Sequence, residues 1–253
     1  MRTLIGGTDT SDPIRGAYPW PEGRPWLRMT MLRGLDGGVT GADNRSGSVS
    51  SEADRDLMAE IRRLADVVLI GAATMRIERY GAIKAAAADA ADRRADGLGP
   101  APTLAIVSAS LDLPWTEAAF GESAVTPIVI TSDLATPDAL ARAEEHAEVV
   151  RLPGEAVSAA AIVAALHERG LTRINCEGGP VLLASFAAED LVDEFDLTVS
   201  PRLPTYGPTT ARAGADAAEP APYDLVQLVE HESFLFARYV RTGCWPGGTA
   251  AGS

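Results

Sequence analysis

The stretch with the clearest chemical content is Glu177-Gly178-Gly179-Pro180, which interrupts an otherwise apolar part of the chain. The residues before it, "LTRIN", are typical of a short strand, and those after it, "VLLASFAAEDLVDE", are typical of a helix. The glycines therefore lie where a strand ends and a helix begins, and backbone N–H groups and the helix dipole favour an anion there. A tight turn with a helix-starting proline explains Pro180 and one glycine. It does not explain two glycines and a carboxylate at the carboxyl end of a strand, where α/β sheets bind ligands.

A second candidate region runs from Leu69 to Gly81, "LIGAATMRIERYG". A continuous apolar run, as expected of a strand buried on both faces, ends at Gly71. Thr74 then offers a hydroxyl at the start of a short helix, and Arg76 and Glu78 follow it. An amphipathic surface helix explains the same pattern, so this region alone leaves both interpretations open.

A third candidate is the polar segment "MLRGLDGGVTGADNRSGS". It begins at the end of a strand expected over Leu27 to Arg33, and Asp36-Gly37-Gly38 is a strong turn signal. Polar loops between a strand and a helix often cover ligands. A flexible hairpin also explains the segment, and its signal is weak when it is taken alone.

Strand patterns alternate with helix patterns along the chain. We expect about nine strands and five helices, with an antiparallel hairpin over Asp224 to Arg241 at the end. This alternation predicts an α/β fold with a central mixed, mostly parallel sheet and helices on both faces. The Ala/Asp/Arg-rich residues 84–100 are expected to form a surface helix or a mobile loop.

The chain shows neither a linker that would separate two domains nor an internal repeat, so we expect one main domain over residues 24–243. Residues 1–23 are expected to form an N-terminal strap, with Trp20 and Trp26 packing on the body of the protein. Residues 244–253 are expected to be a disordered tail.

Composition excludes several classes of function. The chain has 22 basic and 35 acidic residues, a net charge of −13, and such a surface repels nucleic acid and anionic lipid. No apolar run approaches the roughly 18 residues of a membrane helix, and the N-terminus lacks the apolar segment of a signal peptide, so we expect a cytoplasmic protein. Cys176 and Cys244 suggest neither a disulfide framework nor a metal site. The dinucleotide-binding G-x-G-x-x-G, the P-loop and the G-x-S-x-G elbow are absent.

Taken together and in order, the three regions resemble the pyrimidine reductase of riboflavin biosynthesis. The matching text is "MLRGLDGGVTG" with "RSGSVS", then "IRRLADVVLIGAATMRIERYG", then "NCEGGPVLLASFAAEDLVDEFDLTVSPRL". That family is the C-terminal reductase domain of the bifunctional riboflavin deaminase–reductase, here without the deaminase half, and the resemblance covers roughly residues 24–241. It implies a dihydrofolate-reductase-like fold, and reduction of a ribosylamino-pyrimidine, 5-amino-6-(5-phosphoribosylamino)uracil, by NADPH.

The resemblance also implies which residues hold the cofactor. Thr74 and Glu78 match cofactor contacts, Ser108 matches a position near the adenosine, and Gly179 to Ser185 match the segment around the phosphates. The implied cofactor-binding set is Thr74, Glu78, Ser108, Gly178, Gly179, Pro180, Val181, Leu182 and Leu183. We expect NADPH rather than NADH, since the strand ends "VSAS" and "VITSD" offer hydroxyl groups to a 2′-phosphate.

Glu177 matches a substrate-binding carboxylate, and Ser46 and Arg62 match substrate positions. We expect Asp36 and Glu177 to form the catalytic part of the site, with no side chain assigned as the proton donor. The family usually has a lysine where Gly38 stands and an aspartate where Glu78 stands. Two alternatives therefore stay open: a reductase of a pterin or flavin-like substrate, and an NADPH-binding protein without catalysis.

The closing hairpin carries apolar side chains on both faces of both limbs. A hairpin needs only one apolar face for its own core. Few helices remain to cover the second face, and the resemblance implies a dimer. We therefore expect a C2 homodimer with this hairpin near the interface.

Overall fold

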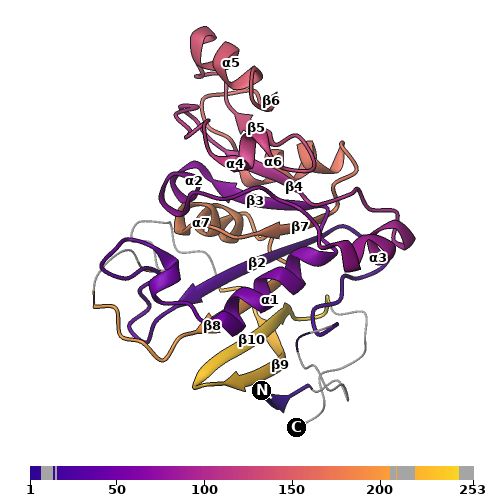
Figure 1. Cartoon of the computed structure of the whole chain (residues 1–253), viewed down its shortest axis with the longest axis vertical. Coiled ribbons are helices and arrows are strands. Elements are labelled where there is room, and N and C mark those ends of the chain that lie inside the picture. The colour runs from indigo at the N-terminus through magenta and orange to yellow at the C-terminus, as the bar shows by residue number, and fades with distance from the viewer. Residues whose placement is uncertain (7–13, 15, 206–208, 210–219, 245–253) are drawn as a thin grey trace.

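The computed structural model describes residues 1–6, 14, 16–205, 209 and 220–244. Its ten strands form one sheet in the order β1-β9-β10-β8-β2-β7-β3-β4-β5-β6 (Figure 1). The strands are β1 (Arg2–Ile5), β2 (Trp26–Arg33), β3 (Val67–Gly71), β4 (Thr103–Val107), β5 (Ile128–Thr131), β6 (Glu148–Arg151), β7 (Arg173–Cys176), β8 (Glu194–Val199), β9 (Tyr223–His231) and β10 (Phe234–Arg241). From β8 to β6 all neighbours are parallel, whereas β10, β9 and β1 extend the sheet in antiparallel fashion.

Helices cover both faces of the sheet. The α-helices are α1 (Glu52–Arg63), α2 (Ala72–Glu78), α3 (Ala90–Ala95), α4 (Ala118–Gly121), α5 (Pro137–Glu144), α6 (Ala159–His167) and α7 (Pro180–Ala188). Apolar side chains of α6 and α7 pack on one face against β2, β3 and β5, and those of α2, α4 and α5 pack on the opposite face. The α1 helix packs on the closing hairpin. The predicted fold class is confirmed: a mixed, mostly parallel sheet with helices on both faces and an antiparallel hairpin at the end.

Local sequence explains these elements. The continuous apolar run Val67–Ile70 has no exposed surface, because β3 lies between helices on both faces. The side-chain hydroxyls of Ser51, Thr136 and Ser158 accept hydrogen bonds from backbone N–H groups and so begin α1, α5 and α6.

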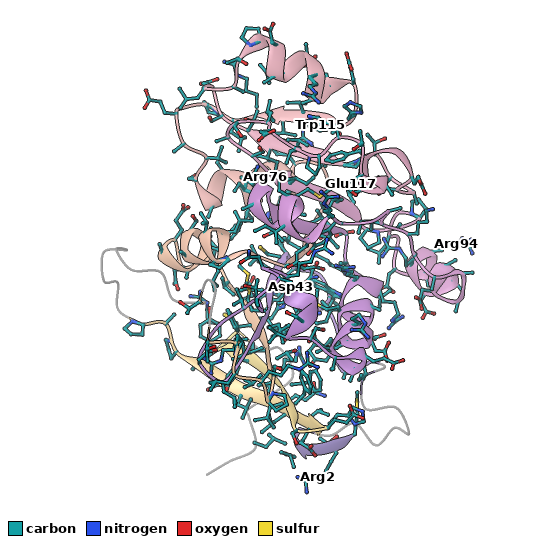
Figure 2. The ribbon with its side chains drawn as sticks, turned by 60° about the vertical axis from the view of Figure 1, so that its left-hand side comes forward. Arg2, Asp43, Arg76, Arg94, Trp115 and Glu117 are labelled. Atoms are coloured by element: carbon teal, nitrogen blue, oxygen red, sulfur yellow. The ribbon has the colours of Figure 1, made fainter. Side chains whose placement is uncertain are left out.

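The predicted count of nine strands and five helices is too low for the described residues. The missed strand, β1, is an exposed edge strand of four residues, and the Arg2 side chain lies at the end of the molecule opposite to Trp115 (Figure 2). Short α4 carries little periodicity and was not predicted, and α3 lies in residues 84–100, where a surface helix was one of two alternatives. The predicted helix after the glycines is also too long. It ends at Ala188, because the Glu189 carboxylate accepts hydrogen bonds from the first N–H groups of α6 and Asp190 is left-handed, with φ of 56°.

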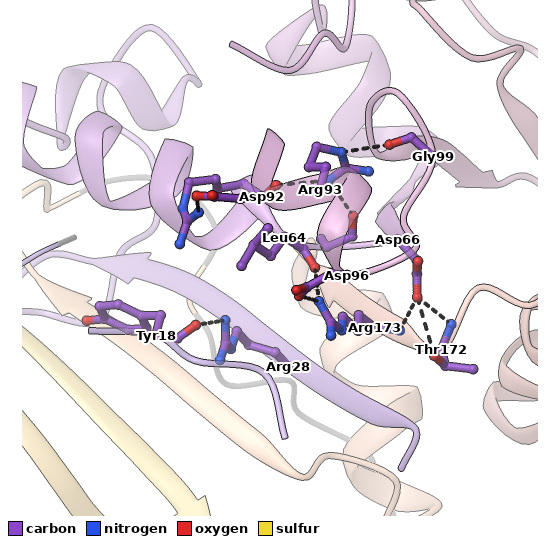
Figure 3. Close-up of polar contacts among 12 residues, drawn as sticks. Tyr18, Arg28, Leu64, Asp66, Asp92, Arg93, Asp96, Gly99, Thr172 and Arg173 are labelled. Carbon is purple, nitrogen blue, oxygen red and sulfur yellow. Dashed lines mark hydrogen bonds and ion pairs between the residues drawn. The ribbon is translucent and has the colours of Figure 1, made fainter. Parts of the chain in front are cut away.

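Residues 84–100 are anchored to the body of the protein. Buried Arg93 of α3 donates to the backbone oxygens of Gly99 at 2.8 Å, Arg63 at 2.9 Å and Ala65 at 3.0 Å (Figure 3). Arg173, at the start of β7, adds an ion pair to Asp96 at 2.6 Å. The predicted helix is therefore present in this insert, and a buried arginine fixes it.

The residues Tyr18 to Trp20, just before β2, pack on Arg28 of the sheet. Arg28 donates to the backbone oxygens of Tyr18 at 3.3 Å and Pro19 at 3.0 Å, and its guanidinium carbon lies 4.3 Å from the centre of the Trp20 ring (Figure 3). The disordered tail was expected over residues 244–253: Cys244 is described and donates its backbone N–H to the Arg241 oxygen at 3.0 Å, and residues 245–253 lie outside the described residues. Where the structure describes the chain, every helix is too short or too polar to cross a bilayer.

Candidate active site

Glu177 is the centre of a polar network just beyond the end of β7. Its Oε1 accepts hydrogen bonds from Arg62 Nε at 2.6 Å and Asn175 Nδ2 at 2.8 Å. Its Oε2 accepts from Arg62 Nη2 at 2.6 Å and from the Tyr80 hydroxyl at 2.8 Å. Thr30 of β2 in turn donates to the amide oxygen of Asn175 at 2.8 Å. The structure thus joins two residues that the sequence assigned to substrate, Arg62 and Glu177, in one bidentate ion pair.

Besides β2, which carries Thr30, three further elements bring this network together. Arg62 lies in the last turn of α1, Glu177 follows β7, and Tyr80 follows the left-handed residue Arg79 that ends α2. Burial raises the pKa of the Tyr80 phenol, and the negative charge of Glu177 raises it further. Tyr80 is therefore a neutral hydrogen-bond donor to the Glu177 carboxylate.

The glycines follow Glu177 at the amino end of α7. Gly178 has φ of +82° and is joined to Gly179 by a cis peptide bond, and the Gly178 oxygen accepts from Gly71 N–H at 2.9 Å. A Cβ on Gly178 would lie 2.9 Å from Met31 Sδ, and one on Gly179 would lie 3.0 Å from Thr74 Oγ1. The two turns that end β3 and β7 are therefore in close contact, and a side chain at Gly178 would also be strained by the positive φ. Gly179 is the N-cap of α7 and supplies no side-chain hydrogen bond, so its first N–H groups stay available to a ligand.

Two other sequence-predicted residues, Ser46 and Glu78, lie together. The Glu78 carboxylate accepts a hydrogen bond from the Ser46 backbone N–H at 2.9 Å. Arg45 donates to the Ile77 oxygen at 3.3 Å beside it. These bonds tie the polar loop before α1 to the end of α2, so Glu78 positions the loop that carries Ser46.

Asp36 holds two other loops together. Its carboxylate accepts hydrogen bonds from the N–H groups of Gly38 at 2.9 Å and Thr205 at 2.7 Å. The bond from Gly38, followed by that from Thr205, lowers the pKa of the Asp36 carboxyl below its ordinary value. Asp36 is exposed, and among the described residues its carboxylate shares no hydrogen-bond partner with Glu177, so the two predicted catalytic carboxylates lie in separate networks.

Ser108 follows β4 and is almost fully buried, at 1% exposed. Its hydroxyl oxygen accepts from Leu111 N–H at 3.0 Å and shapes the turn after the strand. The α2 residue Arg76 donates to the Asp112 oxygen in the same turn at 2.8 Å. An arginine thus lies beside the strand end that the sequence assigned to the adenosine side.

The sequence profile of the RibD C-terminal domain matches residues 25–210, which hold every residue of the networks described above. The chain belongs to this family. The 2,5-diamino-6-ribosylamino-4(3H)-pyrimidinone 5′-phosphate reductase of Archaeoglobus fulgidus is 26% identical over 178 residues, or 70% of this chain and 81% of that protein. Its namesake from Methanothermobacter thermautotrophicus is 27% identical over 71% of this chain and 79% of its own length.

Solved structures of the RibD C-terminal domain family share the fold. A pyrimidine reductase-like protein of Corynebacterium diphtheriae has a TM-score of 0.78 and 26% identity, covering 86% of this chain and 92% of that one. The bifunctional deaminase–reductase of Thermotoga maritima has a TM-score of 0.65 at 19% identity. The match covers 86% of this chain and 57% of that longer one. The predicted family and its dihydrofolate-reductase-like fold are confirmed.

Sequence reasoning missed Tyr80 and Asn175. Asn175 was part of the expected strand, and its position two residues before Glu177 places both side chains on one face. Tyr80 carried no such signal, because only the left-handed turn at Arg79 directs the chain back toward Glu177. Cys176, between the two, is fully buried, and burial raises the pKa of its thiol to about 12, so it serves as a small apolar side chain.

Proposed function

We propose that this protein is an NADPH-dependent reductase of a ribosylamino-pyrimidine phosphate. The observation that carries the proposal is the direct succession of two sites in the chain. The Glu177–Arg62 network is followed at once by a glycine turn and a helix start without a side-chain cap. Family relatives named as reductases of such a pyrimidine support the same reaction.

The glycine turn fits a bound dinucleotide. Neither glycine carries a side chain that would stand between a phosphate and the backbone N–H groups at the start of α7. Gly178, Gly179 and the N–H groups of Val181 and Leu182 would hold the phosphates, with Thr74 beside them. When bound, NADPH supplies the hydride for the reduction.

The protein's own contribution is positioning. The Glu177–Arg62 ion pair is fixed by Tyr80 and Asn175, so the groups that meet the substrate have one geometry before it binds. Glu78 fixes the loop that carries Ser46, and Asp36 joins that loop to Thr205. These separate sets of bonds would fix the loop beside the substrate independently of the Glu177 network, and no side chain is assigned as a general acid.

NADPH is preferred to NADH in this proposal because of Arg76. Its guanidinium already contacts the turn after β4, where Ser108 and Ser110 lie, and a 2′-phosphate there would meet a positive charge. Replacing Arg76→Gln is expected to raise the Kd for NADPH about tenfold and to leave that for NADH unchanged. Equal losses for the two cofactors would place the 2′-phosphate elsewhere.

The reaction is tested by following absorbance of the reduced nicotinamide. The purified protein is incubated with NADPH and the ribosylamino-pyrimidine phosphate, in its 2-amino and its deaminated forms. Consumption of NADPH with either form is expected. A dihydropterin and a free flavin serve as competing substrates, and faster turnover of either would replace the proposed substrate class. NADPH binding without turnover of any of them would make the protein a binding module.

The cofactor site is tested by substitution of Gly179→Val. The side chain is expected to weaken NADPH binding at least about a hundredfold, roughly 2.8 kcal/mol, because it blocks the approach of the phosphate. Gly121→Val is the matched control, since a Cβ there has no neighbour within 4 Å. Normal NADPH affinity in the Gly179 variant would place the phosphates elsewhere.

We further infer a homodimer from the uncovered face of β8 and β10. A groove of about 350 Å³ is lined by apolar and aromatic side chains: Leu183, Ala187, Val192, Phe195, Leu197, Tyr223 and Tyr239. The other face of these strands is already covered by α1 and the N-terminal segment. A second copy of the chain would bury the groove about a two-fold axis. Sedimentation should give twice the chain mass of 26.5 kDa, and Leu197→Glu should give the monomer.

A further inference from the structure

A cavity of about 410 Å³ lies at the opposite end of β7 from Glu177. Its wall is formed by the segment before β2, the end of α1, the end of α3 and the start of β7. Arg173 begins β7 and Glu177 follows it, so the two positions are roughly 13 Å apart along the strand. Among the described residues that line the cavity, none belongs to the Glu177 network or to the glycine turn. The cavity is therefore separate from the positions proposed for substrate and cofactor.

The arginines of the cavity wall are already paired with carboxylates. Arg63 Nε donates to Glu60 at 3.0 Å, and its Nη1 donates to Asp92 at 2.8 Å. Arg173 Nη1 donates to Asp96 at 2.6 Å (Figure 3). Two guanidinium groups thus share three carboxylates, and an anion that entered the cavity would compete with a carboxylate for either of them. The wall therefore favours a ligand without negative charge.

The same wall contains hydrogen-bond donors that lack an acceptor among the described residues. The Arg63 and Arg173 side chains are 12% and 17% exposed, and in each of them Nη2 makes no hydrogen bond within the described part of the chain. Trp20 lines the cavity and is only 7% exposed, and its indole N–H also has no acceptor there. Polar groups in such enclosed places are normally paired. Three unpaired donors around one cavity indicate a place for the acceptor atoms of a ligand.

The cavity also has an aromatic wall. Tyr18 and Trp20 both line it and are 5% and 7% exposed. The Arg28 guanidinium carbon lies 5.7 Å from the centre of the Tyr18 ring and 4.3 Å from that of the Trp20 ring, so one buried arginine fixes both. Fixed aromatic rings offer a flat apolar surface on which another ring can pack. The volume lies in the range of small-molecule sites, roughly 300–1,000 Å³.

We propose that this cavity is a second ligand site, which binds a neutral, flat heterocycle with ring carbonyl groups. The carbonyl oxygens accept hydrogen bonds from the Trp20 indole and from Nη2 of Arg63 and Arg173, and the ring packs on the aromatic wall. Asp96, which binds Arg173 through one oxygen, accepts a ring N–H with the other. A compound bound there is not the reacting substrate, because the cavity shares no lining residue with the Glu177 network.

The test is calorimetric titration of the protein with quinazoline-2,4-dione, a neutral flat ring whose two carbonyls flank a ring N–H. NADP⁺ and the ribitylamino product are present throughout, to fill the proposed active site. The neutral ring should bind. The same ring with an added carboxylate should bind at least about tenfold more weakly, because both guanidinium groups already have carboxylate partners. Absence of binding, or equal affinity for the two compounds, would overturn the proposal.

Trp20→Phe tests the hydrogen bond to the ring. The variant keeps an aromatic side chain and loses the indole N–H, so the Kd for the neutral ring should rise roughly fivefold. Trp115→Phe is the matched control, because Trp115 is similarly buried, at 6% exposed, and packs in a different apolar cluster. The control should leave the Kd unchanged. Equal effects of the two substitutions would show that the ring does not bind at Trp20.

Asp96→Asn tests the charge selectivity at a side chain that is 37% exposed. The variant removes one negative charge from the wall, so the Kd for the carboxylate compound should fall about three- to fivefold. Glu155→Gln removes the same charge from the exposed loop after β6 and should change neither Kd. If Asp96→Asn behaves like Glu155→Gln, the compounds bind elsewhere and the proposal is wrong. None of these measurements requires turnover, so they succeed or fail independently of the proposed reaction.

Discussion

Glu177 and Glu194 lie on the same face of the sheet, with β2 between their strands, and they have the same number of hydrogen bonds. Glu194 accepts four, from Trp26 Nε1, Arg28 Nε, and Arg238 Nε and Nη2, as Glu177 accepts four from its own partners. The partners differ in exposure: the Arg28 and Arg238 side chains are 0% and 5% exposed, against 32% for Arg62. A buried carboxylate that accepts four hydrogen bonds is therefore not evidence of a functional site by itself. We infer that the partly exposed arginine, and not the saturated carboxylate, distinguishes the candidate site at Glu177 from the network at Glu194.

The buried network around Glu194 contains a second carboxylate, Asp196, which has few hydrogen-bond partners. Arg28 Nε lies 3.2 Å from Asp196, but both Asp196 oxygens lack a hydrogen-bond donor among the described residues. Burial raises the pKa of Asp196, and the charge of Glu194 raises it further. Burial also opposes the ionisation of Glu194, but Arg28 and Arg238 outweigh it and lower its pKa to about 2. Glu194 is thus the charged partner of the arginines, and Asp196 retains its proton more readily.

The largest expected effect is on stability, at the buried carboxylate. Glu194→Gln leaves two buried guanidinium groups without their main counter-charge, which costs about 3–5 kcal/mol of unfolding free energy. Denaturant titration of the variant against the wild type measures the loss. A loss below about 1 kcal/mol would mean that the buried arginines are stabilised by other groups.

The contribution of Glu194 should depend on pH in a defined direction. Its pKa is lowered from 4.5 to about 2, so the stabilisation is complete above pH 4.5 and is lost as the pH falls toward 2. The shift corresponds to roughly 3 kcal/mol for this fully buried group. The difference in unfolding free energy between wild type and Glu194→Gln should therefore shrink from pH 5 to pH 2. A difference that stays constant over that range would contradict the assignment.

The matched change at Glu177, whose partner Arg62 is partly exposed, should lower the free energy of unfolding much less. Glu177→Gln keeps the size of the side chain, and water can solvate the freed guanidinium of Arg62. We expect a loss of about 1 kcal/mol, the value of an ordinary hydrogen bond. If this variant were destabilised as strongly as Glu194→Gln, exposure of the partner would not distinguish the two sites.

The smallest effect is expected at Asp196. Its raised pKa means that the folded state is penalised at pH values above the ordinary carboxyl pKa, a sign opposite to that of Glu194. Asp196→Asn removes this penalty along with one ion pair, so the unfolding free energy near pH 7 should change by less than about 1 kcal/mol. A loss of several kcal/mol would show that Asp196 is ionised and needed by Arg28.

The fold was largely predictable from sequence because its elements are locally encoded. The run Val67–Ile70 and the capping residues Ser51, Thr136 and Ser158 each specify their element without distant contacts. Edge strand β1 was not predictable, since its side chains are exposed and only pairing with β9 makes it a strand. The glycine turn was found because its residue types are unusual for a buried strand end.

The networks were harder to predict, because they depend on contacts between distant parts of the chain. Arg62 and Glu177 are 115 positions apart, and the resemblance placed both at the substrate without showing that they bind each other. Tyr80 reaches the site because the backbone at Arg79 is left-handed. Arginine is not a residue type that predicts such a turn. From the sequence alone, Glu194 would be taken for an acidic surface residue. The structure shows that it is buried between Arg28 and Arg238.

We propose that the network around Glu177 and the partly exposed Arg62 serves the reaction, whereas the buried network around Glu194 serves the fold. Turnover of NADPH and the ribosylamino-pyrimidine phosphate by folded Glu177→Gln tests it most directly, with the folded fraction checked by thermal melting. The variant should bind NADPH as the wild type does and lose roughly ten- to a thousandfold in turnover, because Arg62 and Tyr80 are no longer held in place. Full turnover by this variant would contradict the account.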